Sequence, residues 1–117
     1  MATGSLLMAT SPQAQAFTDV SDASGSANTG FYSPGFSWGD YDADGDLDLY
    51  VANWATAVSV PANKLLNNAG DSTFADVAAS LGVDNDQNRI AATWADYDND
   101  GDLDLYVVDF FDQDYLY

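Results

Sequence analysis

The sequence contains no cysteine, no histidine and no glutamate. Without cysteine or histidine, the chain has no disulfide, no thiol nucleophile and none of the usual zinc ligands, and it lacks the commonest general base. Only two residues are basic, Lys64 and Arg89, against 19 acidic residues that are all aspartate, so the net charge is -17. Because nucleic acids and anionic membranes are bound through clustered lysine and arginine, we expect neither as a partner.

Long hydrophobic runs are also missing, so we expect no membrane insertion. The first sixteen residues carry no charge and end in Ala14-Gln15-Ala16, a pattern similar to a signal-peptidase site. They lack a basic start, and their apolar core is short. We therefore interpret residues 1–16 as a weak or N-terminally clipped signal peptide, with a disordered leader as the alternative. Residues 17–117 are expected to form one domain.

What the chain does contain is an internal repeat. The segment "WGDYDADGDLDLYVANW" (38–54) returns as "WADYDNDGDLDLYVVDF" (94–110), and "FTDVSDASG" (17–25) returns as "FADVAASLG" (74–82). Hydrophobic residues make up 47% of the chain and are interleaved with the aspartates, which favours a folded domain over a disordered acidic tail. The repeat unit has the length of one propeller blade.

Apolar alternation and turn residues predict strands but no sustained helix. Strands are expected near Phe17 and over the ranges 36–39, 47–53, 64–67, 73–77, 90–95, 103–109 and 114–117. Strand 47–52 is apolar on both faces, which suits a sheet packed between two neighbours. The predicted fold class is therefore all-β: a β-propeller fragment of antiparallel four-stranded blades, with about one complete blade and parts of two others.

The crowded aspartates need a counter-ion, because two like charges about 5 Å apart repel by roughly 3 kcal/mol at an effective dielectric constant of 20. In "DYDADGDLD" the side chains at loop positions 1, 3, 5 and 9 can converge, a glycine at position 6 permits the bend, and the carbonyl at position 7 adds an oxygen. Calcium accepts about six to eight oxygen ligands in flexible geometry. We expect two Ca²⁺ sites, formed by Asp40, Asp42, Asp44, Asp46 and Asp48, and by Asp96, Asp98, Asp100, Asp102 and Asp104.

Other readings of these loops are a solvated acidic turn, an EF-hand and a two-metal catalytic centre. An EF-hand needs an acid at position 12 and flanking helices, but Val51 and Val107 stand there, inside predicted strands. A two-metal centre needs ions about 4 Å apart, whereas neighbouring packed sheets are about 10 Å apart. The solvated turn is the remaining alternative, and any bound calcium is expected to be structural.

Together with "NKLLNNAGDSTFADV" between them, the two loops resemble the FG-GAP/VCBS repeats of integrin-α-like β-propellers. Within this family, the sequence is most similar to the repeats of bacterial secreted proteins that also carry ASPIC/UnbV segments. The resemblance covers residues 17–117. It implies a calcium-stabilised propeller that is secreted or on the cell surface and is used for adhesion or for binding a protein or carbohydrate ligand.

We expect no enzymatic activity, because the chain has few catalytic residue types. The alternative is a non-catalytic fragment of a secreted calcium-dependent carbohydrate-active enzyme with a similar propeller. Trp38 and Trp94 are expected to pack between blades, and Trp54, Phe110 and Phe111 to lie in loops near the rim. Open blade edges also predict self-association.

Overall fold

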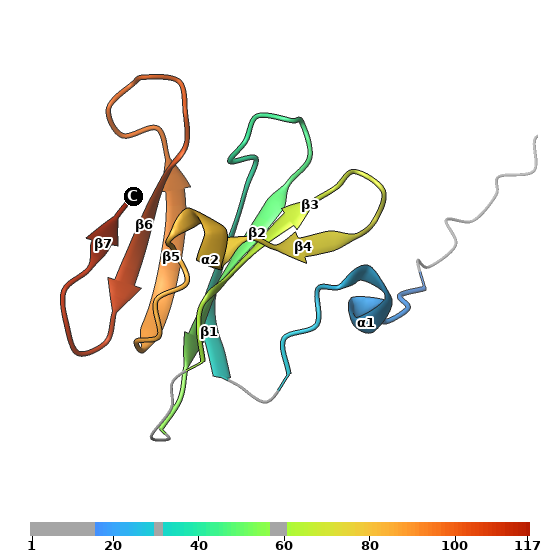
Figure 1. Cartoon of the computed structure of the whole chain (residues 1–117), viewed down its shortest axis with the longest axis horizontal. Helices are drawn as coiled ribbons and strands as arrows, with labels where there is room; N and C mark the ends of the chain where they lie inside the picture. Colours follow the sequence, from blue (N-terminus) through green and yellow to red (C-terminus); the bar gives the residue numbers. More distant parts are fainter. Residues whose placement is uncertain (1–15, 30–31, 57–60) are drawn as a thin grey trace, which may run out of the picture.

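Seven β-strands in two antiparallel sheets form the framework of the computed structural model, which describes residues 16–29, 32–56 and 61–117 (Figure 1). The first sheet has the order β1-β2-β3-β4 and the second the order β5-β6-β7. The strands are β1 (Tyr32–Gly39), β2 (Asp48–Trp54), β3 (Lys64–Asn68), β4 (Phe74–Asp76), β5 (Arg89–Ala95), β6 (Asp104–Asp109) and β7 (Tyr115–Leu116). The all-β prediction of a propeller fragment is confirmed. The predicted leader, residues 1–16, lies outside the described residues apart from Ala16.

Strand β1 begins at Tyr32, four residues before the predicted start at Phe36. Its first half contains Pro34 and Gly35, and proline and glycine are both disfavoured in the interior of a strand. The structure accommodates them because β1 is an edge strand and its register shifts between Tyr32 and Gly35, so that Tyr32 still pairs with Trp54.

The repeated segments 17–25 and 74–82 each contain a one-turn helix, α1 (Ser21–Ser24) in the first and α2 (Ala78–Leu81) in the second. In both segments the helix is followed by a glycine with positive φ, Gly25 in the first and Gly82 in the second. The prediction of a strand near Phe17 was wrong, since residues 16–20 have no strand structure. The second segment begins with β4 (Phe74–Asp76), because its residues pair with β3. The first segment pairs with no strand among the described residues.

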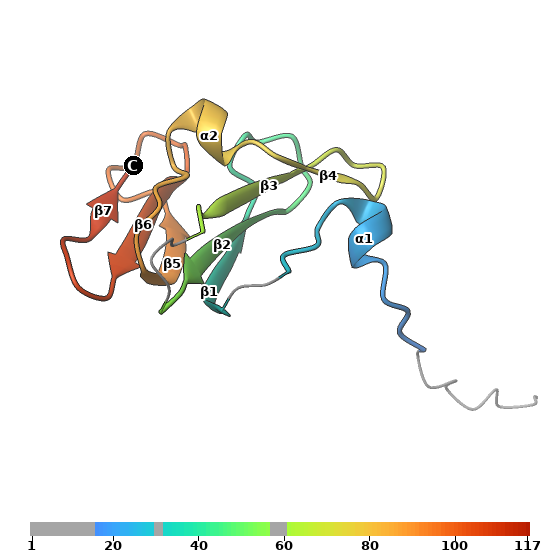
Figure 2. The same cartoon turned by 60° about the horizontal axis from the view of Figure 1, so that its bottom comes forward.

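The two sheets pack face to face, with β5 against β1 and β2 (Figures 1 and 2). The shared core consists of Tyr50, Ala52, Leu65, Leu105 and Val107 from the sheets and Ala78 and Val83 from the connection between them. Trp94 reaches across this interface: its ring stacks on Tyr41 with centroids 6.2 Å apart, and its indole N–H donates to the carbonyl of Ser37 at 3.3 Å. The prediction that the two tryptophans pack between blades is confirmed for Trp94. It is wrong for Trp38, which is 48% exposed and packs on Phe74 of its own sheet with ring centroids 6.4 Å apart.

Two glycines of β1 allow this close contact. A Cβ at Gly39 would lie 2.7 Å from the ring of Trp94, and a Cβ at Gly35 would lie 2.5 Å from the carbonyl oxygen of Ile90. Both distances are below van der Waals contact, so a side chain at either position would push the sheets apart. The glycines therefore set the spacing between the two sheets.

Strand β2 is buried on both faces, as its apolar pattern predicted. Tyr50 and Ala52 face the second sheet, and Val51 is buried on the opposite face. The segment containing α1 lies beside β3 and β4 (Figure 1), and Lys64 donates from its Nζ to the carbonyl of Ala27 at 3.0 Å. The first sheet thus lies between the α1 segment and the second sheet.

A polar cluster lies at the end of each sheet away from the acidic loops, and the two clusters differ in charge. In the first sheet, the hydroxyl of Ser33 donates to Asn53 Oδ1 at 2.9 Å. In the second sheet, the residues 56 positions later are Arg89 and Asp109, which form a buried ion pair. The same position in the fold therefore holds a neutral pair in one repeat and an ionic pair in the other.

Candidate metal sites

The first acidic loop, residues 40–47, joins β1 to β2 and folds around its first aspartate. The backbone N–H groups of Asp44 and Gly45 donate to the two carboxylate oxygens of Asp40 at 3.0 and 3.1 Å. Gly45 has a φ of 97°, a conformation that the absence of a Cβ permits. The N–H of Asp44 also lies 3.3 Å from the carboxylate of Asp42, which draws positions 1 and 3 together.

The second acidic loop, residues 96–103, joins β5 to β6 and repeats this conformation. The N–H groups of Asp100 and Gly101 donate to Asp96 at 3.1 and 3.2 Å, and Gly101 has a φ of 102°. The N–H of Asp100 lies 3.2 Å from the carboxylate of Asp98. Both loops lie at the same end of the molecule, at the top of Figure 1.

Three carboxylates converge in each loop, at positions 1, 3 and 9. One oxygen of each lies within 4.8 Å of the other two. The residues are Asp40, Asp42 and Asp48 in the first loop and Asp96, Asp98 and Asp104 in the second. Calcium holds its oxygen ligands at about 2.3–2.6 Å, so two ligands on opposite sides of one ion lie about 5 Å apart. Both groups therefore have dimensions that fit a single Ca²⁺ ion.

The predicted ligands at positions 5 and 7 lie outside these convergent groups. The carboxylate of Asp44 accepts the N–H of Asp46 at 2.9 Å, and that of Asp100 accepts the N–H of Asp102 at 3.0 Å. The carboxylate of Asp46 lies beside Gly70 in the β3–β4 hairpin. Participation of Asp44 and Asp100 by side chain, and of Asp46 and Asp102 by carbonyl, stays a prediction.

Asp48 is the most enclosed member of either group, with none of its surface exposed to solvent. Its carboxylate accepts the backbone N–H groups of Tyr41 at 3.2 Å and Asn68 at 2.8 Å. Burial raises the pKa of Asp48 above its usual 3.8, and the nearby charges of Asp42 and Asp44 raise it further, against the lowering effect of the two N–H groups. A cation placed among these carboxylates would relieve both the burial cost and the repulsion.

Strand β3 supports the first loop through Asn67 and Asn68, although the sequence predicted only a strand over residues 64–67 here. The side-chain amide of Asn67 donates to Asp42 at 2.9 Å, and that of Asn68 donates to the carbonyl of Leu47 at 3.2 Å. In the sequence, the feature that could have indicated this supporting role is the Asn-Asn pair at the end of "KLLNN". In the second loop, the ninth position is more open: Asp104 is half-buried and accepts the N–H of Tyr97 at 2.9 Å.

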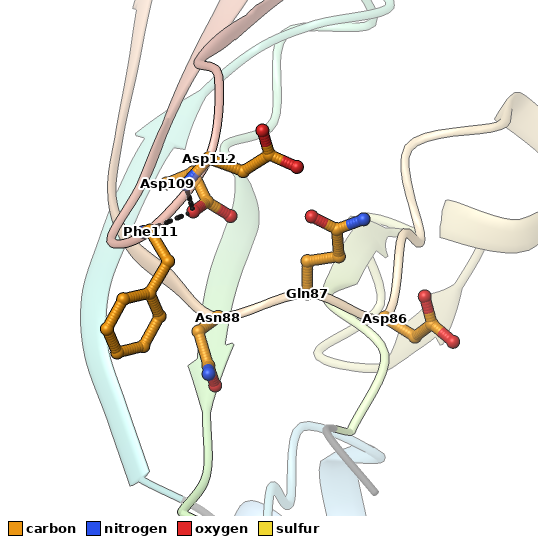
Figure 3. Close-up of a pocket in the computed structure, with 6 residues that line it drawn as sticks. All are labelled: Asp86, Gln87, Asn88, Asp109, Phe111 and Asp112. Carbon is orange, nitrogen blue, oxygen red and sulfur yellow. Dashed lines mark hydrogen bonds between the residues drawn. The ribbon is translucent and has the colours of Figure 1, made fainter.

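The predicted rim aromatics do not form one surface. Phe110 and Phe111 are exposed and pack edge to face with centroids 4.6 Å apart, whereas Trp54 is half-buried and packs on Tyr32. Figure 3 shows Phe111 beside a shallow concavity of about 290 Å³ at the end of β6 opposite the acidic loops. It is lined by Asp86, Gln87, Asn88, Asp109, Phe111 and Asp112. None of the predicted metal ligands lies in this concavity.

Two stacked antiparallel sheets, each with the same acidic loop at the same end, define a β-propeller type of repeat protein. Residues 53–107 match the family model of the FG-GAP-like repeat, in agreement with the resemblance found in the sequence. The matched segment runs from the end of β2 through the second acidic loop to β6. No match was found among curated proteins. In the part of the chain that the structure describes, no helix is long and apolar enough to cross a membrane.

Proposed function

We propose that this protein is a calcium-binding propeller repeat module outside the cell, in which each acidic loop holds one structural Ca²⁺ ion. One observation carries the proposal: two loops far apart in the sequence place the same three carboxylates within 4.8 Å of one another. The proposed side-chain ligands are Asp40, Asp42, Asp44 and Asp48 in the first site and Asp96, Asp98, Asp100 and Asp104 in the second. The carbonyls of Asp46 and Asp102 complete the two sets.

Charge explains why a divalent cation would bind. Each pair of carboxylates about 5 Å apart repels by roughly 3 kcal/mol at an effective dielectric constant of 20, and three such pairs meet in each group. All of the proposed ligand atoms are oxygens, which favours calcium or magnesium over softer metals. Magnesium demands a tighter octahedron and retains its waters, so a flexible loop of carboxylates favours calcium.

The position of the loops explains why the role would be structural. The first loop joins β1 to β2, and the second joins β5 to β6, so each closes the β-hairpin at one edge of its sheet. Since the carboxylates repel in the absence of a cation, calcium binding would stabilise the folded hairpins and would be coupled to folding. The proposed module contributes no catalysis of its own.

Isothermal titration calorimetry on chelator-treated protein tests the proposal, with magnesium titrated in parallel. We expect two Ca²⁺ ions per chain, one in each of the single variants Asp42→Asn and Asp98→Asn, and none in the double variant. Asparagine keeps the side-chain shape and removes the charge. The matched control is Asp22→Asn, because Asp22 is exposed and lies in α1, outside both loops.

Tryptophan fluorescence gives a second readout, because Trp94 stacks on Tyr41 of the first loop. Calcium should change the emission of the original chain and of Asp22→Asn, but not that of the double variant. Absence of saturable calcium binding, or binding that persists in the double variant, contradicts the proposal and leaves the aspartates as solvated surface charge.

The proposed location and partner rest on the family, whose repeats are typically extracellular. The partner would be an extracellular protein or carbohydrate bound in an adhesive or recognition role. Secretion is tested by expressing the chain with its own N-terminus and sequencing the N-terminus of the exported product, where cleavage after Ala16 is expected. Retention of the whole chain inside the cell would contradict the proposed location.

A further inference from the structure

One half-buried side chain from outside the acidic loops reaches the carboxylates of the first loop. Asn67 lies near the end of β3, the strand that pairs with β2. In this pairing Leu49 is opposite Leu66. The residues one step closer to the loop, Asp48 and Asn67, therefore stand side by side, and side chains opposite each other in a ladder share one face of the sheet. The pairing of β3 with β2 thus brings Asn67 to the candidate metal site.

The side-chain amide of Asn67 is aimed at the converging carboxylates. Its Nδ2 lies 2.9 Å from Oδ2 of Asp42 and 3.5 Å from Oδ1 of Asp48, which are two of the three members of the first group. The hydroxyl of Tyr41 lies 3.4 Å from the same nitrogen. One end of a neutral polar side chain therefore lies between two carboxylates that the proposed cation would bridge.

The two ends of this amide are used unequally. Among the described residues, no donor is bonded to Oδ1 of Asn67, whereas Oδ1 of the neighbouring Asn68 accepts the N–H of Gly70 at 3.1 Å. The NH₂ and oxygen ends of an amide have nearly the same shape, and a half-turn about the last side-chain torsion exchanges them. Carboxylates alone attract the NH₂ end, because an ionised carboxylate only accepts hydrogen bonds. A cation among the carboxylates attracts the oxygen end instead.

We propose that Asn67 is a further ligand of the first metal site and binds Ca²⁺ through its Oδ1. This inference rests on the proposed calcium-binding function. The first loop offers one oxygen from each of four aspartate side chains and one carbonyl oxygen, whereas calcium takes about six to eight oxygen ligands. The side-chain oxygen of asparagine is among the ligands that calcium uses. Asn67 thus supplies a sixth oxygen from outside the loop.

A ligand on β3 changes which strands the ion holds together. The loop ligands belong to the connection between β1 and β2, so an ion bound to them alone stabilises one hairpin. An ion that also binds Asn67 joins β3 to this hairpin, and β3 is paired in turn with β4. The ion would therefore stabilise the first sheet across its whole width.

The variant Asn67→Asp tests ligation by adding a charge at the proposed ligand position. Calcium affinity is measured by isothermal titration calorimetry in the Asp98→Asn background, which leaves the first site alone. We expect the affinity to rise about fivefold or more, because the affinity of a calcium site increases with the charge of its ligands. The matched control is Asn68→Asp, which adds the same charge one residue along the strand, where the side chain contacts Leu47 and Gly70 instead of the carboxylates.

The luminescence decay of bound Eu³⁺ in H₂O and in D₂O gives a second readout, because it counts the water molecules on the ion. Eu³⁺ has nearly the radius of Ca²⁺ and the same preference for oxygen ligands. In the Asp98→Asn background, Asn67→Ala should add about one water molecule, since solvent fills the ligand position that is lost. Asn68→Ala should add none. If Asn67 only holds Asp42 in place, the number of water molecules stays the same in Asn67→Ala.

The outcomes separate this inference from the proposed function. An unchanged water count in Asn67→Ala, or a gain in affinity for Asn67→Asp no larger than for Asn68→Asp, overturns the role of Asn67 while calcium binding itself stands. Absence of saturable calcium binding overturns both. Near-ultraviolet circular dichroism reports whether each variant is folded, and Asn67→Asp keeps the test decisive if Asn67→Ala does not fold. In the Asp42→Asn background, which leaves the second site alone, Asn67→Asp should not change the calcium affinity.

Discussion

Replacing Arg89 with serine tests how strongly the buried ion pair stabilises the second sheet. Arg89 has no exposed surface and pairs with Asp109. Its Nε also donates to Asn85 at 3.2 Å, and its guanidinium carbon lies 4.4 Å from the ring centroid of Tyr115. The substitution removes all of these contacts and leaves the carboxylate of Asp109 buried without a cation.

The size of the effect follows from what remains around that carboxylate. Removing one partner of a buried ion pair costs about 3–5 kcal/mol. The backbone N–H groups of Phe111 and Asp112 still donate to Asp109, so the expected loss is at the lower end, about 3 kcal/mol. Small domains are stable by only about 5–15 kcal/mol, so the variant loses a large part of its free energy of unfolding.

Urea denaturation followed by far-ultraviolet circular dichroism measures this loss. The matched variant is Arg89→Ser with Asp109→Asn, which installs the neutral pair that Ser33 and Asn53 form in the first sheet. We expect the double variant to lose less stability than the sum of the two single variants, with a coupling of roughly 2 kcal/mol.

Two results would refute this reasoning. A loss below about 1 kcal/mol for Arg89→Ser is the size expected of an ordinary surface substitution and would mean that the pair is not enclosed. Strict additivity of the two substitutions would mean that Arg89 and Asp109 do not depend on each other.

Three further predictions concern packing and ionisation. Gly35→Ala should reduce the free energy of unfolding by about 1–3 kcal/mol, because its Cβ would meet the β5 backbone at 2.5 Å; an unchanged urea midpoint would contradict the close approach of the sheets. Tyr50→Phe should cost about 1 kcal/mol in the same assay, since the buried hydroxyl donates to the carbonyl of Val83 at 3.0 Å; no loss would mean that this bond contributes nothing. Tyr106→Phe should move the pKa of Asp114 up towards 3.8 in an NMR titration, because the Tyr106 hydroxyl is the main cause that lowers it. Because the pKa of Asp114 is lowered by folding, ionised Asp114 stabilises the fold above its unfolded-state pKa, and this stabilisation is lost as the pH falls through its folded-state pKa. The stabilisation should be smaller in Tyr106→Phe. An unchanged pKa of Asp114 in this variant would refute the role given to the Tyr106 hydroxyl.

The acidic loops were predictable because their signal is local. In each loop the aspartates and the glycine lie within nine residues. The structure brings together the side chains at positions 1, 3 and 9 of the predicted positions 1, 3, 5 and 9, and position 5 lies outside the group. The strands that flank the loops were predictable for the same reason. Strand β6, for example, begins one residue after its predicted start at Leu103.

Features that depend on distant residues were not predictable. A lysine or arginine is usually exposed, and only the folded structure shows that Arg89 is buried against Asp109, 20 residues away. The role of Asn67 beside Asp42 likewise depends on the pairing of β2 with β3. The strand expected near Phe17 failed because a strand needs a paired edge, which the local pattern does not supply.

The shared position of the two acidic loops gives the molecule an electrical polarity along its strands. Ten of the 19 aspartates lie in the segments 40–48 and 96–104, five in each, at the end shown at the top of Figure 1. Lys64 and Arg89 stand at the beginning of β3 and β5, towards the other end. A charged surface would therefore exert a torque on the protein as well as a net force. At ionic strengths where the Debye length approaches the size of the domain, about 30 Å at 0.01 M, an anionic surface would turn the acidic loops towards the solvent.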